Sequence, residues 1–105
     1  MQNFGEFWPF YLREHRKPLT RALHFAGTSL SILLILSALA LRRPLLVIPA
    51  LLCGYAFAWV GHFFVEHNRP ATFKYPFWSF AADFRMLACA LTGKLDAELQ
   101  KAGVS

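Results

Sequence analysis

Two long apolar segments, separated only by Arg42 and Arg43, contain no Asp, Glu, Lys or Arg. As helices that rise about 1.5 Å per residue, both are long enough to cross a hydrocarbon core roughly 30 Å thick. Their short basic connection, which ends in a proline, is typical of a tight turn between antiparallel helices. We therefore predict a hairpin of two membrane spans, over residues 20–41 and 44–66.

The segments on either side of this hairpin have a more mixed pattern. Aromatic residues and a histidine recur every three or four positions near the N-terminus, at Phe4, Phe7, Trp8, Tyr11 and His15. This spacing places them on one helical face and predicts an amphipathic helix at the membrane interface over residues 4–17. A later apolar stretch carries Asp83 and Arg85, and it fits either a surface helix or an inserted one. We predict a third, membrane-embedded helix over residues 76–93, followed by a polar tail over residues 94–105.

The composition favours a membrane protein over a soluble one. Of the 105 residues, 56% are hydrophobic and only 16% are charged. A chain of this size has too little interior to hide so much apolar surface from water. We therefore expect one all-α integral membrane domain over residues 1–105. Three short helices bury little surface on their own, so a homodimer is a further expectation.

The basic residues are placed around the hairpin rather than gathered in one run. The formal net charge is +5, but we expect no nucleic-acid partner, because basic residues that flank apolar spans fit lipid headgroups. Only two of them, Arg42 and Arg43, lie in the hairpin turn. Those near the open end of the hairpin are Arg13, Arg16, Lys17, Arg21, Arg69 and Lys74. This imbalance predicts that the N-terminus and the loop after the second span face the cytoplasm.

Histidines provide the candidate chemistry. His24 lies near the start of the first span and His62 near the end of the second, so an antiparallel hairpin brings both to one end. His15 precedes the first span at that same end, where we also expect Asp83. Glu66 follows His62 by four residues and shares its face in an α-helix. Imidazoles with a carboxylate suit non-haem Fe(II), with zinc as the alternative. Histidines that are merely polar residues of the membrane interface remain the other interpretation.

Several short blocks make the sequence resemble a known family. The blocks are YLREH at 11–15, LHFAGT at 23–28, WVGHFFVEHNRPATFKYP at 59–76, and Trp78-Ser79 with Asp83. The most specific of them is Gly-His-x3-Glu-x-Asn-x-Pro, which begins at Gly61. The sequence resembles the small membrane-protein family that includes the fungal Fe(II)-dependent 2-hydroxy fatty acid dioxygenase of phytosphingosine degradation. The resemblance extends from about Phe4 to Leu91.

This resemblance implies an Fe(II)-dependent dioxygenase of fatty acid α-oxidation. Such an enzyme converts a 2-hydroxy fatty acid and O2 to a fatty acid one carbon shorter, with loss of CO2. The resemblance implies His15, His24 and His62 as the metal ligands. We also expect Glu66 and Asp83 as catalytic carboxylates, and Arg21, Asn68, Arg69 and Lys74 as substrate-binding residues. The expected location is a bacterial inner membrane, with the site on the cytoplasmic side. The alternatives are a non-enzymatic lipid-binding or scaffold protein, and a zinc or haem protein.

Overall fold

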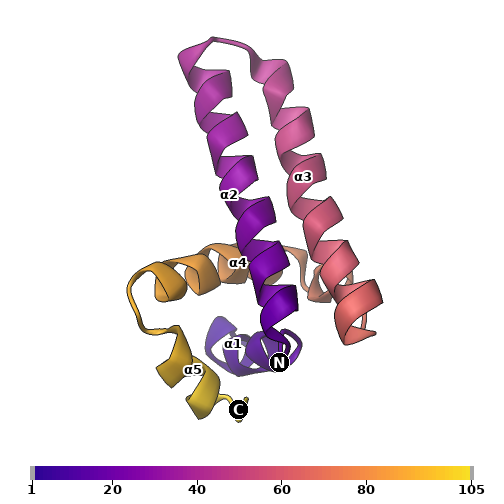
Figure 1. The fold of residues 1–105 in the computed structure, drawn as a ribbon, viewed down its shortest axis with the longest axis vertical. Helices are drawn as coiled ribbons and strands as arrows, with labels where there is room; N and C mark the ends of the chain where they lie inside the picture. Colours follow the sequence, from indigo (N-terminus) through magenta and orange to yellow (C-terminus); the bar gives the residue numbers. More distant parts are fainter. Residues whose placement is uncertain (1, 105) are drawn as a thin grey trace.

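A long antiparallel hairpin dominates the computed structural model, which describes residues 2–104 (Figure 1). Its first arm is α2 (Pro18–Ala40). Its second arm is a continuous helical rod over Pro44–Glu66, and both arms are long and apolar enough to cross a membrane. The parts of the rod are the 3₁₀ turn η1 (Pro44–Leu46), α3 (Val47–Val60) and the π-helix η2 (Gly61–Glu66). The rod therefore begins and ends where the second span was predicted.

The outer surface of the hairpin is apolar and largely uncovered by the rest of the chain. Leu33 is 60% exposed, Leu39 is 73% exposed and Leu52 is 64% exposed. Side chains of this kind need an apolar environment, and two backbones whose hydrogen bonds are satisfied within helices suit the interior of a bilayer. The two arms pack closely where Gly27 meets the rod, because a Cβ at that position would lie 2.8 Å from the Cβ of Phe57.

Three shorter helices gather at the base of the hairpin (Figure 1). These are α1 (Phe4–Arg13), α4 (Pro76–Leu91) and α5 (Leu95–Lys101), and the 3₁₀ turn η3 (Ala71–Phe73) precedes α4. Figure 1 shows α4 crossing the base rather than lying along the hairpin. The prediction placed this third helix at 76–93, and it ends slightly earlier because Gly93 takes a left-handed conformation with φ of 75°.

The first helix is shorter than the predicted 4–17. It begins at an Asn3 cap, whose side chain accepts a hydrogen bond from the Glu6 N–H, and it ends at Arg13. A turn follows, and Pro18 then opens α2 at its first position, where the missing N–H has no helical partner to lose. The break leaves His15 in the turn between two helices rather than on the amphipathic helix itself.

The buried core lies in the base rather than in the hairpin. Phe7, Tyr11, Leu12 and Met86 are almost completely buried there, between α1 and α4. The C-terminal segment joins this core through three residues that are no more than 6% exposed, namely Leu99, Ala102 and Val104. The predicted polar tail is therefore a packed amphipathic helix. The packed helices of the base lie below the open end of the hairpin (Figure 1).

Candidate metal centre

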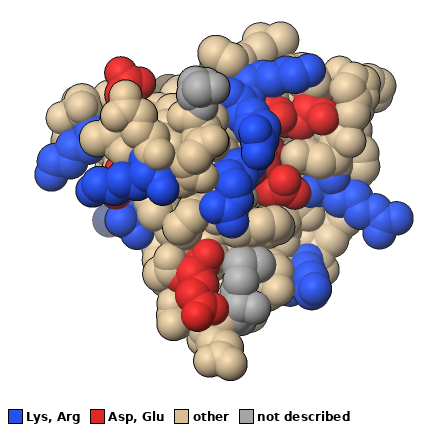
Figure 2. Space-filling view, turned by 90° about the horizontal axis from the view of Figure 1, so that it is seen from below, with Lys and Arg blue, Asp and Glu red and all other residues tan. Residues whose placement is uncertain are grey.

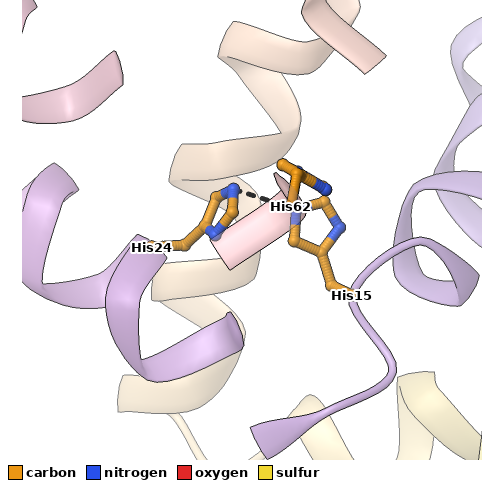
Figure 3. Close-up of side chains that lie close together, drawn as sticks. All are labelled: His15, His24 and His62. Carbon is orange, nitrogen blue, oxygen red and sulfur yellow. Dashed lines mark hydrogen bonds between the residues drawn. The ribbon is translucent and has the colours of Figure 1, made fainter. Parts of the chain in front are cut away.

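Three histidines from three different segments meet at the junction of the base and the hairpin (Figure 3). His15 comes from the turn after α1, His24 from the second turn of α2, and His62 from η2. One ring nitrogen from each lies within 4.8 Å of the other two, and the residues are 1%, 4% and 2% exposed, respectively. The structure thus brings together the three predicted ligands.

Each histidine is oriented by a carbonyl oxygen at its Nδ1 atom. His15 Nδ1 lies 2.6 Å from the Tyr11 carbonyl, and His24 Nδ1 lies 2.9 Å from the Thr20 carbonyl. His62 Nδ1 lies 2.7 Å from the Asn68 Oδ1. Because a carbonyl oxygen can only accept, Nδ1 must carry the proton in all three rings. The Nε2 atom of each ring is then an unprotonated lone pair.

The amide of Asn68 has a fixed orientation. Its Nδ2 atom donates to the Glu14 carbonyl at 3.1 Å, which leaves Oδ1 to face His62. This one side chain therefore connects the second arm of the hairpin with the turn that bears His15. Carbonyl partners of this kind, placed behind histidine ligands, fix the ring and raise its basicity toward a metal.

The unprotonated nitrogens face one another. The Nε2 atoms of His15 and His24 are 3.0 Å apart, and neither can donate when both Nδ1 atoms hold the protons. Burial and the neighbouring imidazoles hold the pKa of His15 well below its ordinary value, so an imidazolium does not resolve the conflict. A metal cation bound by these nitrogens would resolve it. The donor set, three neutral imidazoles with Nδ1-bound carbonyls, fits a divalent transition metal.

The π-helix places His62 in this cluster. Within η2 the backbone turns more widely than an α-helix, and the Asn68 N–H donates to the His62 carbonyl at 2.9 Å. Gly61 permits the close contact with α2, because a Cβ there would lie 3.1 Å from the Thr20 Cγ2. His67 ends the segment in a left-handed conformation with φ of 61° and is exposed, away from the cluster.

Glu66 is not part of the histidine cluster, although its spacing predicted that it would share a helix face with His62. Its Oε2 accepts a hydrogen bond from the Lys17 backbone N–H at 2.6 Å, and the Lys17 Nζ donates to the Val65 carbonyl at 2.9 Å. The carboxylate therefore caps the start of α2, where the partial positive charge of the helix end favours it. It ties together the two segments that carry His24 and His62.

Asp83, on α4, lines a pocket that the three histidines also line. Its Oδ1 accepts a hydrogen bond from the Tyr11 hydroxyl, and the Tyr11 ring packs on the His15 ring with centroids 4.1 Å apart. Burial raises the pKa of Asp83 to about 6, and burial together with the Asp83 charge raises the pKa of Tyr11. A carboxyl group of this kind can hold or release a proton near neutral pH.

Two polar residues of this region were not predicted as site residues. Tyr11 belongs to the aromatic stripe of the N-terminal segment, and its place four residues before His15 was the available signal. Ser79 lines the pocket one turn before Asp83 and is 3% exposed. Its Oγ finds no hydrogen-bond partner among residues 2–104. The block Trp78-Ser79 was the available signal, but the place of the hydroxyl at the pocket depends on how α4 crosses the hairpin.

The predicted substrate-binding residues fall into two groups. Arg21 donates to the carbonyls of His15 and Arg16, both at 2.8 Å, and Asn68 orients His62, so these two shape the site. Arg69 and Lys74 are exposed on the outside of the base. Figure 2 shows basic side chains spread over this end of the molecule. Such a surface can attract anions to the site without forming part of it.

A comparison with family models decides the relationship. The model for 2-hydroxy-palmitic acid dioxygenase Mpo1-like proteins matches residues 1–95. This chain belongs to the Mpo1-like family. The match covers the three histidines of the metal centre and reaches the start of α5. No curated protein and no solved structure matches the chain, so the assignment of this Mpo1-like protein rests on the family match alone.

Proposed function

We propose that this Mpo1-like protein is an Fe(II)-dependent dioxygenase that shortens 2-hydroxy fatty acids by one carbon. The observation that carries the proposal is the convergence of three buried histidines, with one ring nitrogen of each within 4.8 Å of the other two and a carbonyl oxygen at each Nδ1. The family name supports the choice of a dioxygenase over other uses of such a site. His15, His24 and His62 would hold the iron, and iron supplies the chemistry that activates O2.

The reaction balances without an external reductant. A 2-hydroxy acid and O2 give a shorter carboxylic acid, CO2 and water, and the bond between carbons 1 and 2 breaks. The 2-hydroxy carbon becomes the new carboxyl carbon, and the substrate itself supplies the electrons that reduce O2. The protein must therefore bind the substrate's head at the histidines, exclude bulk water and manage protons.

Proton handling falls to the pair formed by Tyr11 and Asp83. The Tyr11 hydroxyl occupies Oδ1 of Asp83, which leaves Oδ2 to hold the proton lost from the substrate's 2-hydroxyl. The raised pKa of Asp83, about 6, suits a base that works near neutral pH. Glu66 is satisfied by the Lys17 N–H, so we assign it to positioning the ligand-bearing segments rather than to the reaction.

The location of the site follows from the hairpin. We place the two arms across a membrane, here a bacterial inner membrane, with the base and its basic surface on the cytoplasmic side. The three histidines then lie at the depth of the lipid headgroups. Arg69 and Lys74, exposed at this level, would attract the substrate's carboxylate, while its alkyl chain remains in the bilayer.

The deciding experiment is the metal content of protein purified anaerobically in detergent and reconstituted with Fe(II). We expect about one iron per chain, loss of that iron in His62→Ala, and retention in His67→Asn, a control that preserves a residue tolerant of left-handed φ. Oxygen consumption with 2-hydroxypalmitic acid should be lost in the variant that loses iron and kept in the variant that retains it. Zinc that cannot be replaced by iron, or no metal in the wild type, would contradict the proposal.

A further inference from the structure

A groove leads away from the metal centre along the hairpin. It is lined by residues that continue the helical registers of two of the histidines. These are Thr28, Ser31 and Ile35 beyond His24 on α2, and Ala58, Gly54 and Ala50 before His62 on the rod. Their spacing of three or four residues places each set on one helix face. The groove therefore starts at the histidines and runs along the face of the hairpin where the two arms meet.

The two ends of the groove differ in chemistry. Every titratable side chain that lines it, apart from Tyr55, lies at the base, together with the buried Ser79 hydroxyl that lacks a partner within residues 2–104. Farther up, the Ser31 hydroxyl donates to the Ala50 carbonyl at 2.5 Å and so presents no free donor. The polarity of the groove matches a molecule with one polar head and one apolar tail.

The rod presents three small residues to the groove, beside Leu51 and Tyr55. Ala50, Gly54 and Ala58 line the groove, whereas Leu52 is 64% exposed on the outer surface. Small side chains leave the room that an alkyl chain needs. The tail of such a ligand leaves lipid rather than water, so its burial gains little free energy. The groove must therefore select by shape rather than by hydrophobicity.

The length of the groove fits a long acyl chain. The interval from His24 to Ile35 along α2 is about 16 Å at roughly 1.5 Å per residue. An extended alkyl chain advances roughly 1.3 Å per carbon, the projection of a bond of about 1.5 Å, so about a dozen carbons fit between these residues. The interval from Leu51 to His62 on the rod has the same length. A chain of sixteen carbons would fill the groove and emerge near the hairpin turn.

We propose that this groove binds the alkyl tail of the substrate and that Ala58 and Ile35 set the chain lengths it accepts. The inference rests on the proposed function for the identity of the head group, which lies at the histidines beside Ser79. It adds the path of the tail, along the groove between α2 and the rod. The preferred chain length then depends on the distance along the groove from the histidines to the first bulky side chain.

The test compares substitutions at two depths with a matched control. Ala58→Phe places a large side chain one turn from His62, Ile35→Trp places one at the far end, and Ala56→Phe makes the same change on the exposed side of the same helix. Equilibrium binding of 2-hydroxy acids of six, ten and sixteen carbons is measured in nanodiscs without oxygen. Turnover is therefore not required for the measurement.

We expect a graded result. Ala58→Phe should weaken binding of the ten- and sixteen-carbon acids by at least about tenfold and leave the six-carbon acid within about twofold, since overpacking excludes only the part of the tail that reaches it. Ile35→Trp should weaken only the sixteen-carbon acid, and Ala56→Phe should change none. Loss that is equal for all lengths, or no loss, would overturn the inference.

A different molecule in the groove, or the failure of only one of the two proposals, would give a different experimental result. A phospholipid that co-purifies and is not displaced by the sixteen-carbon acid, or a dimer that Ala58→Phe dissociates, would overturn the assignment of the tail. If graded binding is found but iron-loaded protein consumes no oxygen, the groove stands and the dioxygenase proposal falls. If oxygen consumption occurs with an unchanged length profile in both groove variants, the dioxygenase stands and the groove falls.

Discussion

Asn68 accepts a hydrogen bond from the Nδ1–H of His62 and at the same time donates one to the Glu14 carbonyl. The amide thereby holds one candidate metal ligand, on the hairpin, against the turn that bears another, His15. Asn68→Ala should weaken metal binding by about 10–100-fold, the usual effect of removing a partner behind a ligating histidine. Asn68→Asp keeps the acceptor for His62 and should lose less. Competition with a chelator of known affinity measures both.

Substitutions at Glu66 distinguish a metal ligand from a cap at the start of α2. Because its carboxylate accepts the Lys17 N–H, Glu66→Ala should lower the free energy of unfolding by about 1 kcal/mol, as for other lost N-terminal caps. Glu66→Gln retains an acceptor and should cost less. Both variants should keep the wild-type metal stoichiometry. Metal loss in Glu66→Gln without a change in stability would instead place this carboxylate at the metal.

The buried Asp83 makes stability depend on pH in a defined window. Its pKa rises from 3.8 to about 6 on folding, so the folded state binds the proton more tightly. This contribution to stability is present below pH 4, is lost as the pH rises toward 6, and reaches at most about 3 kcal/mol. The lowered pKa of His15 acts in the opposite direction below pH 6.5, so the informative quantity is a difference between variants.

Asp83→Asn should remove this pH-dependent contribution to stability while keeping an acceptor for the Tyr11 hydroxyl. Unfolding of the metal-free protein in detergent, followed from pH 4 to 7.5, should therefore show the variant gaining stability relative to the wild type as the pH rises. A constant difference between the two proteins over this range would contradict the assignment of the titration to Asp83.

The core of the base predicts a contribution from the C-terminal helix. Leu99→Ala removes a side chain that is 6% exposed and should destabilise the protein by about 2 kcal/mol or more. Leu91→Ala provides the matched control, because Leu91 is 78% exposed and should change little. Thermal unfolding in detergent distinguishes them. Equal effects would show that α5 does not share the core in solution.

The sequence predicted the hairpin and the histidine cluster for one physical reason. Uncharged segments long enough to cross a bilayer have few alternatives to spanning helices, and an antiparallel pair necessarily brings His24 and His62 to the same end. The spacing of aromatic residues near the N-terminus added His15, although it placed this residue on a helix and the structure places it in a turn. The helical rod has the same ends as the predicted second span, since Pro44 and the left-handed His67 mark them.

The details that failed depend on backbone geometry and tertiary contacts. Glu66 follows His62 by four residues, but its carboxylate accepts the Lys17 N–H, a contact between distant segments that the spacing does not encode. The unpartnered Ser79 hydroxyl and the bond between Tyr11 and Asp83 arise where α4 crosses the hairpin. No local pattern encodes that crossing, because it is set by the packing of aromatic residues from distant segments.

The separate origins of the three histidines impose an order on assembly. During synthesis, His15 and His24 leave the ribosome well before His62, and two imidazoles hold a metal more weakly than three. The third nitrogen arrives only when the rod has returned beside α2 and η2 has formed its wide turn. A metal ion held by all three nitrogens would thus be captured late, by a chain whose fold already shields it, and its tight binding would report that the hairpin has closed.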